Sequence, residues 1–493
     1  MSEATVRRRF RATSRGAGAL TVASYAILGS ILFWTRFTGL DRSYWHDEIT
    51  TIEDFVRRGP SKILAGVYYP NNHELFNLLA WATTSLVGES EVALRLVSVV
   101  PFIVGVAVVT SWLHLRLGPV SGILFLFLAT FSPLLLDLSR EARGYGLAFL
   151  AMSVLIVAAL EADRAARAGS LVAFCLAGVV GTLTLPNFGI AFLATGVVLL
   201  TDSRLRRRAA VGLFFSILAI STWYGPNLDE LLVSSRQVFG VRINGLEVLT
   251  APMYHVLLPG LFLLADKKAV PGILWLAFIA VLLLPLSASP LLRTRRTALI
   301  LGSGLVATCV TLWVSRTYVV PRFLSFLLVP LFVVLASGIA SIVERFTTRP
   351  PHARTLAVVA TLTLLSAAFV SGALKVLRLP PEAHKNVATL IGERVSPSVP
   401  VFAHMREPGD LAFYLGRSVV YTRRIPDAAS RLCARKRETV LVVDRFRVEP
   451  FNAPCIQRPG TRMYRFEQYT RGGEISVWFI PPANETLGRF VSP

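Results

Sequence analysis

The sequence predicts a polytopic α-helical membrane protein that ends in a small α/β domain outside the membrane. The chain has 493 residues, of which 53% are hydrophobic and only 16% charged, and its mean hydropathy is +0.57. These values lie outside the range of soluble domains. Apolar stretches of roughly 20 residues, the length that crosses a bilayer core, recur over the first three quarters of the chain. Beyond residue 379, Pro, Gly and charged residues return.

The apolar stretches predict about eleven transmembrane helices, within a range of roughly 10 to 13. Helices are expected because they satisfy every backbone amide inside the bilayer. The predicted spans are 17–36, 92–113, 119–137, 146–161, 170–185, 188–201, 209–224, 271–290, 297–314, 323–343 and 355–376. The apolar stretch 251–265 is short, so a span, a re-entrant segment and an interfacial helix all stay open for it.

The Lys and Arg residues of the short joints predict the orientation, because such residues favour the cytoplasmic side. With the predicted spans above, the short segments rich in Lys and Arg all fall on the same side of the membrane. They are 7–15, 164–167, 204–208, 293–296 and 345–354. The N-terminal residues 1–16 are therefore expected in the cytoplasm. The loop 37–90 and the tail are expected outside it. The first apolar stretch is long for a signal peptide and lacks a clear cleavage site, so it is treated as a span.

The net charge of +21 does not indicate nucleic-acid binding in this chain. Many arginines serve topology and anionic lipid headgroups instead. Cys175 and Cys309 lie in predicted spans and are expected to be small core residues. Cys433 and Cys455 lie in the exported tail, where the sequence leaves open whether they form a disulfide.

The tail, 380–493, is predicted to be an extracytoplasmic α/β domain. Strands are expected at 399–403, 439–443 and 475–480, and helices at 383–394 and from residue 410. No catalytic constellation is visible in it, so a lid or acceptor platform is the favoured role. The membrane domain is then 17–379, with 37–90 as its catalytic loop.

A polar cluster follows the first predicted span directly and contains Asp47 and Glu48. Two adjacent carboxylates at a bilayer edge favour a functional role over simple solubility. The loop 37–90 that holds them is too long for a connector. Residues 48–58 and 73–87 have the apolar spacing of juxtamembrane amphipathic helices, with 70–72 as turn and cap of the second. The loop is therefore expected to enclose a polar pocket.

Later segments bring further polar residues to the same membrane surface. Arg95 begins the second span, and the turn after the third contains Arg140, Glu141, Arg143 and Tyr145. The sequence has no Walker loop, dinucleotide fingerprint, zinc-binding helix or paired-Cys motif. Any chemistry is therefore expected at the exported loops.

In order and spacing these motifs resemble the protein O-mannosyltransferase and aminoarabinose-transferase group of the glycosyltransferase C superfamily. The motifs are the pair 47–48 and the segments 72–79, 91–98, 140–145 and 321–324. The resemblance covers residues 1–200 well. Two departures are His73-Glu74-Leu75, where the group has His-Pro-Pro-Leu, and Phe323, where Tyr is common.

The resemblance implies an inverting transfer of a single sugar from a polyprenyl-phosphate donor to an acceptor on the extracytoplasmic side. Asp47 is then the base, because an acceptor hydroxyl needs a positioned carboxylate. The departing phosphate needs cations, and the candidates are Arg95, Arg140, Arg143 and Arg322. His73 and Tyr145 are expected substrate contacts. Glu48 and Glu141 are expected to orient arginines, bind sugar hydroxyls or hold a divalent cation, which the sequence does not require.

Each of these residues has a structural alternative. Asp47 alone would suit a helix cap, and arginines at span ends are often interfacial anchors. Glu141 would pair with a neighbouring arginine, His73 would start a helix, and Tyr145 would belong to the aromatic belt of the membrane.

Other functions stay open beside a membrane glycosyltransferase. A lipid-linked oligosaccharide ligase or polymerase would differ in donor size. A transporter should show repeated halves, which the sequence lacks, and a membrane scaffold would not need Asp47. The Ala-, Arg- and Val-rich composition fits a bacterial plasma membrane protein. Nothing in the sequence distinguishes the sugar, or a protein acceptor from a glycolipid or cell-wall glycan.

Overall fold

The fold is taken from a computed structural model. It describes residues 3–65, 72–229, 285–315, 321–347, 369–370, 373–374, 376–378, 383–405, 408–421, 438–444, 460–467 and 474–481. The chain divides into two compact units. A helical unit comprises 1–40 and 53–377, and a second unit comprises 41–52 and 378–493. The sequence-based domain limits of 17–379 and 380–493 stay a prediction.

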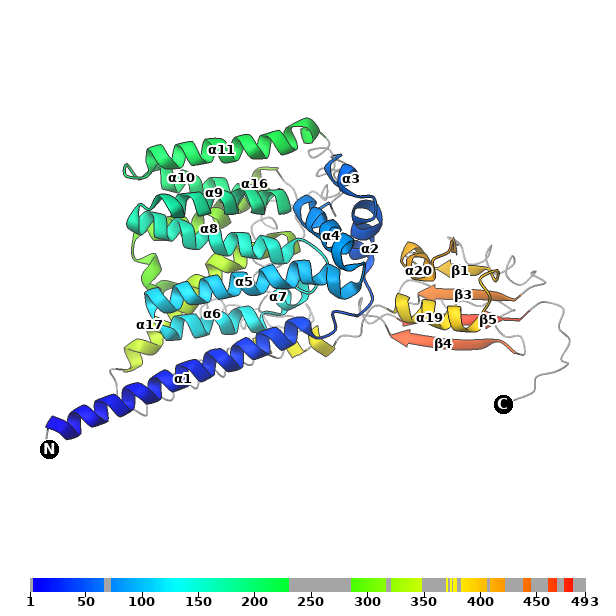
Figure 1. The fold of residues 1–493 in the computed structure, drawn as a ribbon, viewed down its shortest axis with the longest axis horizontal. Coiled ribbons are helices and arrows are strands. Elements are labelled where there is room, and N and C mark those ends of the chain that lie inside the picture. The colour runs from blue at the N-terminus through cyan, green and yellow to red at the C-terminus, as the bar shows by residue number, and fades with distance from the viewer. Residues whose placement is uncertain are drawn as a thin grey trace. The chain divides into compact units, whose positions relative to one another are not determined.

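The helical unit is a bundle that forms around α5 and α8 (Figure 1). Its elements are α1 (Glu3–Phe37), α3 (Pro60–Leu64), α4 (Glu74–Val87), α5 (Glu91–Leu117), α6 (Pro119–Phe131), α7 (Pro133–Leu138), α8 (Tyr145–Ala165), α9 (Ala168–Thr184), α10 (Phe188–Leu200), α11 (Arg206–Tyr224), α16 (Arg295–Ser315), the 3-10 helix η5 (Pro321–Leu327) and α17 (Leu328–Thr347). Most of α8 is buried, and α5 and α9 pack on it.

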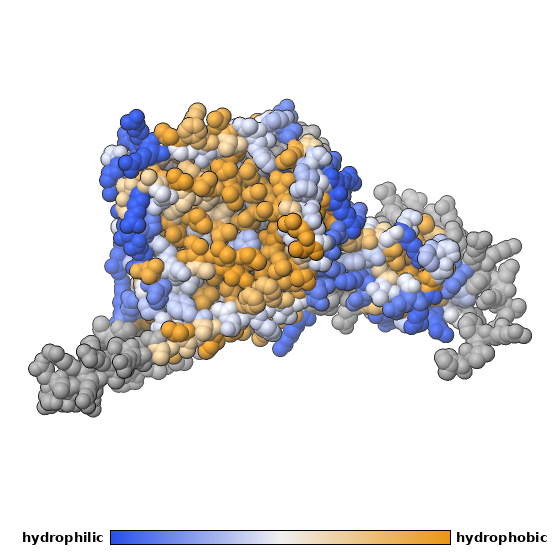
Figure 2. Space-filling model, in the orientation of Figure 1, coloured by the Kyte–Doolittle hydropathy of each residue, from blue (hydrophilic) through white to orange (hydrophobic). Residues whose placement is uncertain are grey.

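Small residues allow this close packing. A Cβ on Gly105 of α5 would lie 3.0 Å from the backbone of Leu150 in α8. Where side chains do meet, aromatic rings fill the space, as Phe102 and Phe149 do at 4.6 Å between ring centroids. The surface that faces outward is apolar between two polar edges (Figure 2), as expected of helices that face lipid.

Within the described residues, five helices are long and apolar enough to cross a membrane: Ala19–Phe37, Glu91–Leu117, Tyr145–Ala165, Arg206–Asn227 and Arg322–Arg345. Shorter apolar helices are Pro119–Phe131, Ala168–Thr184 and Phe188–Leu200. The prediction of a polytopic helical protein is confirmed. Most of the predicted spans 271–290 and 355–376, and all of 251–265, lie outside the described residues, as do Cys433 and Cys455.

Of three local predictions, one is confirmed and two are wrong. The predicted span 119–137 is two helices, because Pro133 forces Ser132 into an extended conformation (φ −62°, ψ 115°) and a new helix begins there. The predicted helix 48–58 is confirmed, since a short α-helix, His46–Thr51, continues directly as a π-helix, Ile52–Val56, and its apolar residues are buried. The predicted cap Asn72 does not cap α4. Its N-cap is His73, and the side-chain oxygen Oδ1 of Asn72 accepts a hydrogen bond from Asn77 Nδ2 at 2.8 Å.

The C-terminal residues form the α/β domain that the sequence predicts. Its five-stranded mixed sheet has the order β2-β1-β3-β5-β4, with β1 parallel to β2 and β3, and β5 antiparallel to β3 and β4. The strands are β1 (Val401–His404), β2 (Val420–Tyr421), β3 (Thr439–Asp444), β4 (Arg462–Glu467) and β5 (Glu474–Ile480). Helices α19 (His384–Arg394) and α20 (Pro408–Leu415) pack on each other and share the core of the sheet. This unit also includes α2 (His46–Thr51).

Candidate active site

The turn between α7 and α8 brings charged residues into the protein interior. All residues from Ser139 to Gly146 are buried. The start of α8 lies directly on α5, where the Gly146 amide donates to the Ser98 hydroxyl at 3.2 Å. A Cβ on Gly146 would lie 1.9 Å from the Ser98 carbonyl oxygen. Glycine at this position therefore fixes where the turn and its arginines lie.

His73 and Arg143 form the central polar contact of the helical unit. The Arg143 guanidinium donates to His73 Nε2 at 2.9 Å, although the two residues are 70 positions apart. Both side chains are buried, with 1% and 0% of their surfaces exposed. Because a guanidinium only donates, Nε2 is the acceptor and the ring proton lies on Nδ1.

The charge state of this histidine follows from its surroundings. Burial, and then the positive charges of Arg143 and Arg322, hold the pKa of His73 well below its ordinary value of 6.5. His73 is therefore a neutral imidazole at physiological pH. Gly144 leaves room for it, because a Cβ there would lie 2.8 Å from His73 Nδ1 and 2.6 Å from Thr184 Cγ2.

Two aromatic rings complete this arrangement. Tyr145 meets the His73 ring edge-on at 5.4 Å, and Phe323 stacks on it at 6.2 Å. The Arg143 guanidinium lies 5.2 Å from the Tyr145 ring centroid and 5.9 Å from that of Phe323, while that of Arg322 lies 5.7 Å from Phe323. We call these five residues, His73, Arg143, Tyr145, Arg322 and Phe323, the His73 cluster. Cations held against aromatic faces keep their orientation.

Two more predicted arginines each lie close to the residues that follow α1. Arg95 is 1% exposed and donates to the Leu40 carbonyl at 2.8 Å. Arg140 is 3% exposed. Its guanidinium lies next to Gly39, because a Cβ added to Gly39 would be 3.3 Å from Arg140 Nη2. The sequence therefore predicted a group of arginines that the fold does bring into one region of the helical unit.

Arg36 and Glu74 are two buried charged residues that the sequence motifs do not indicate as part of the site. Arg36, 0% exposed, donates to the carbonyls of Ala129 and Thr130 at the end of α6, at 2.8 and 3.1 Å. An arginine inside the first apolar stretch was the available signal. Glu74 is 2% exposed and accepts a hydrogen bond from Trp223 of α11. The signal for Glu74 was that a glutamate stands where the related motif has a proline.

Asp47 and Glu48 lie on α2 in the other compact unit. Glu48 is 1% exposed and its carboxylate accepts from the Trp45 amide at 3.1 Å, which closes the start of the helix. The N-cap is Trp45, so the alternative in which Asp47 caps the helix is wrong. Glu141, 7% exposed, lies in the α7–α8 turn of the helical unit. Among the described residues no three His, Cys, Asp or Glu side chains gather as metal ligands.

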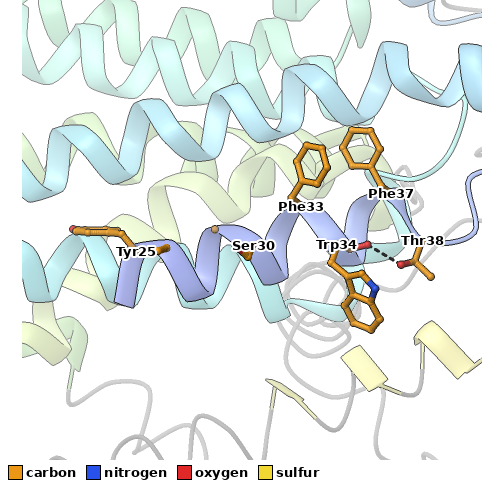
Figure 3. A pocket seen from close by; sticks show the side chains of 8 residues that line it. Tyr25, Ser30, Phe33, Trp34, Phe37 and Thr38 are labelled. Carbon is orange, nitrogen blue, oxygen red and sulfur yellow. Dashed lines mark hydrogen bonds between the residues drawn. The ribbon is translucent and has the colours of Figure 1, made fainter. Parts of the chain in front are cut away.

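A surface groove along α1 is distinct from these groups (Figure 3). It is lined by α1 residues and the Thr38 that follows, namely Tyr25, Ala26, Gly29, Ser30, Phe33, Trp34, Phe37 and Thr38. Phe33 and Trp34 are 56% and 59% exposed. Because this lining carries no charged side chain, it suits contact with lipid better than catalysis.

The fold of this polytopic helical chain is similar to the folds of solved structures. ArnT from Cupriavidus metallidurans has this fold. Its apo structure is 16% identical over 94% of this chain and 98% of ArnT, with a TM-score of 0.52. The structure of ArnT bound to undecaprenyl phosphate is 15% identical over the same shares of the two chains, with a TM-score of 0.54.

A second solved structure shares the fold. The archaeal oligosaccharyltransferase AglB from Archaeoglobus fulgidus, in complex with an inhibitory peptide and a dolichol-phosphate, is 11% identical over 86% of this chain and 69% of AglB, with a TM-score of 0.52. No protein-family model and no curated protein matches the chain. The resemblance inferred from the motifs is thus confirmed as a similarity of fold, and it extends well beyond residues 1–200.

Proposed function

We propose that this protein transfers a single sugar from a polyprenyl-phosphate donor to an acceptor on the extracytoplasmic face of a bacterial plasma membrane. The observation that carries the proposal is the group of buried arginines around His73, in a fold that ArnT uses to bind undecaprenyl phosphate. A buried cationic site beside lipid-facing helices suits a phosphate on a lipid chain.

In this proposal the cations hold the leaving group. Arg143 and Arg322 are held by the rings of the His73 cluster, while Arg95 and Arg140 lie near the end of α1. Charge that develops on the departing phosphate is stabilised by donors already in place, which is the larger part of such catalysis. The neutral His73 offers a donor at Nδ1, and Tyr145 offers its ring and hydroxyl for sugar contacts.

Asp47 is the proposed base. The acceptor oxygen forms a bond to the anomeric carbon while the bond from that carbon to the phosphate oxygen breaks. The hydroxyl proton goes to the Asp47 carboxylate, and the phosphate leaves as an anion on its lipid. Attack opposite to the leaving group inverts the anomeric centre. Glu48 is proposed to keep the helix that carries Asp47 in shape, and Glu141 to orient arginines or sugar. None of these roles requires a divalent cation.

The topology of about eleven spans, with N-terminus in the cytoplasm and the α/β domain outside it, belongs to the same proposal. The described basic residues of the joints 204–208 and 293–296 support it. Arg204 and Arg296 lie at the opposite end of α8 from Tyr145, close to Asp163 and Asp202.

An oligosaccharide ligase is the second candidate, because AglB shares the fold. The length of the structural match favours the transfer of a single sugar, since this chain covers 98% of the ArnT chain but only 69% of the AglB chain.

The proposal is tested by incubating a panel of labelled polyprenyl-phosphate sugars with membranes that contain the parent protein or Asp47→Asn. Label should enter an acceptor with the parent, and Asp47→Asn should slow transfer by roughly 10² to 10⁴. The matched control is Asp54→Asn, since the Asp54 side chain is half-exposed and pairs only weakly with Arg58 at 3.2 Å. Transfer only from an oligosaccharide diphosphate would support the ligase instead.

A further inference from the structure

The segment that carries the carboxylate pair belongs to the same compact unit as the C-terminal domain. Residues 41–52 group with 378–493, although more than 300 positions separate them. The helix α2 in this segment has six residues and continues into the five-residue π-helix Ile52–Val56, and a helix of this total length is still too short to be stable alone in water. Its conformation must therefore depend on what it packs against.

Tyr44 is the apolar part of this packing. Its side chain is 2% exposed, and its ring meets Phe413 of α20 edge-on at 6.1 Å. The Tyr44 amide also donates to the Tyr414 hydroxyl at 2.5 Å. The segment before α2 is thus fixed to α20 through both the backbone and the ring of Tyr44.

His46 and Asp410 are the polar part. His46 Nδ1 lies 3.0 Å from Asp410 Oδ1, and the Asp410 side chain is only 4% exposed while that of His46 is 45% exposed. Asp410 lies in the first turn of α20 and His46 directly precedes Asp47. Lys385 of α19 adds a longer contact of 3.4 Å to the Asp41 carbonyl.

We infer that Asp410 is a positioning residue. Through His46 it holds α2 and thereby sets the orientation of the Asp47 carboxylate, so the C-terminal domain takes part in catalysis without touching substrate. A displacement of a catalytic group by about 1 Å is enough to cost about 10²-fold in rate. This inference rests on the proposed role of Asp47 as base.

The test is kinetic and uses the full-length protein in membranes or detergent. Asp410→Ala should lower kcat about tenfold or more. It should leave the donor KM and the affinity for undecaprenyl phosphate unchanged, because the proposed phosphate holders belong to the helical unit. Asp410→Asn should recover most of the activity, since its amide oxygen still accepts from His46 Nδ1–H. Arg394→Gln is the control, because Arg394 contacts Tyr464 within the C-terminal unit.

A second comparison separates positioning from folding. In an Asp47→Asn background, Asp410→Ala should have no further effect on the residual rate, because the group that it positions is gone. His46→Ala removes the same contact from its exposed partner and serves if Asp410→Ala does not fold, as judged by thermal melting.

The outcomes distinguish the two proposals. If Asp47→Asn abolishes transfer but Asp410→Ala and His46→Ala keep the parent kcat, the positioning inference is wrong and the function stands. The inference would also be overturned if Asp410→Ala lowered the transfer rate by the same factor in the parent and in the Asp47→Asn background. A loss of affinity for undecaprenyl phosphate in Asp410→Ala would overturn it as well. If Asp47→Asn itself is fully active, the proposed function fails first.

Discussion

The two ends of α8 show two different uses of arginine. Near Ala165, arginines pair with carboxylates in half-exposed contacts: Arg116 with Glu161 at 2.7 Å, Arg204 with Asp202 at 2.9 Å and Arg296 with Asp202 at 2.9 Å. These arginine side chains are 29% to 57% exposed. The pairs of Arg116 and Arg296 join neighbouring parts of the helical unit, and such clusters are typical of a membrane surface.

Near Tyr145, about 30 Å away along the helix, the arginines are buried. Arg143 and Arg95 are 0% and 1% exposed, and they contact a histidine nitrogen, a backbone carbonyl and aromatic rings. Burying a cation costs free energy, and buried arginines are therefore candidates for a functional role. We propose that the difference in burial, more than the residue type, marks the functional end.

The largest expected effect is on transfer. Arg143→Gln should lower kcat/KM for the lipid donor by about 10²-fold, because a donor to the leaving phosphate is lost. Arg204→Gln, at the opposite end, should stay within about twofold since exposed pairs contribute little. Initial rates with labelled donor, normalised to folded protein, measure both. Similar losses in the two variants would remove the distinction between the ends.

The next effect is on packing at the buried end. Gly146→Ala should lower the free energy of unfolding by about 2–3 kcal/mol, because its Cβ would overlap the Ser98 carbonyl. Gly169→Ala in α9 is the control, since a Cβ there meets nothing within 4 Å. Thermal melting in detergent compares them. A Gly146→Ala protein as stable as the parent would show that α5 and α8 can separate at this point without cost.

His73 should make stability depend on pH. Its folded-state pKa is lowered below the ordinary 6.5, so the unfolded chain binds the proton more readily. Stability is then complete above about pH 6.5 and falls as the pH decreases below it. Between neutral pH and about pH 5, the free energy of unfolding of His73→Asn should fall by about 1–2 kcal/mol less than that of the parent. Melting curves between about pH 7.5 and 5 measure this, and equal slopes in both proteins would contradict the buried, neutral histidine.

The smallest effect is expected at the exposed end. Arg116→Gln removes the pair with Glu161 but should cost only about 0–1 kcal/mol of stability. Transfer activity should not change. A loss of activity in this variant would mean that the exposed end also contributes to the site.

Hydropathy predicted the helices well because crossing a bilayer constrains length and composition together. The described parts of the predicted spans are helical except for a few residues, and the strands at 439–443 and 475–480 are confirmed. The break at Ser132 was not predicted, although Pro133 was its signal.

The site was predictable in its residue types but not in its contacts. Motif spacing pointed to His73, Arg140 and Arg143, but the contact between His73 and Arg143 joins residues 70 apart, which no local pattern reports. The contact between His46 and Asp410 spans 364 residues. It depends on how α20 packs, and the tail offered no motif that would have indicated it.

Binding of undecaprenyl phosphate to the purified protein is the decisive measurement of whether the buried arginines of the helical unit hold a lipid phosphate. Arg143→Gln should raise the Kd about tenfold or more, while Arg204→Gln should leave it unchanged. Equal affinity in the parent and both variants, with all three folded, would contradict this prediction.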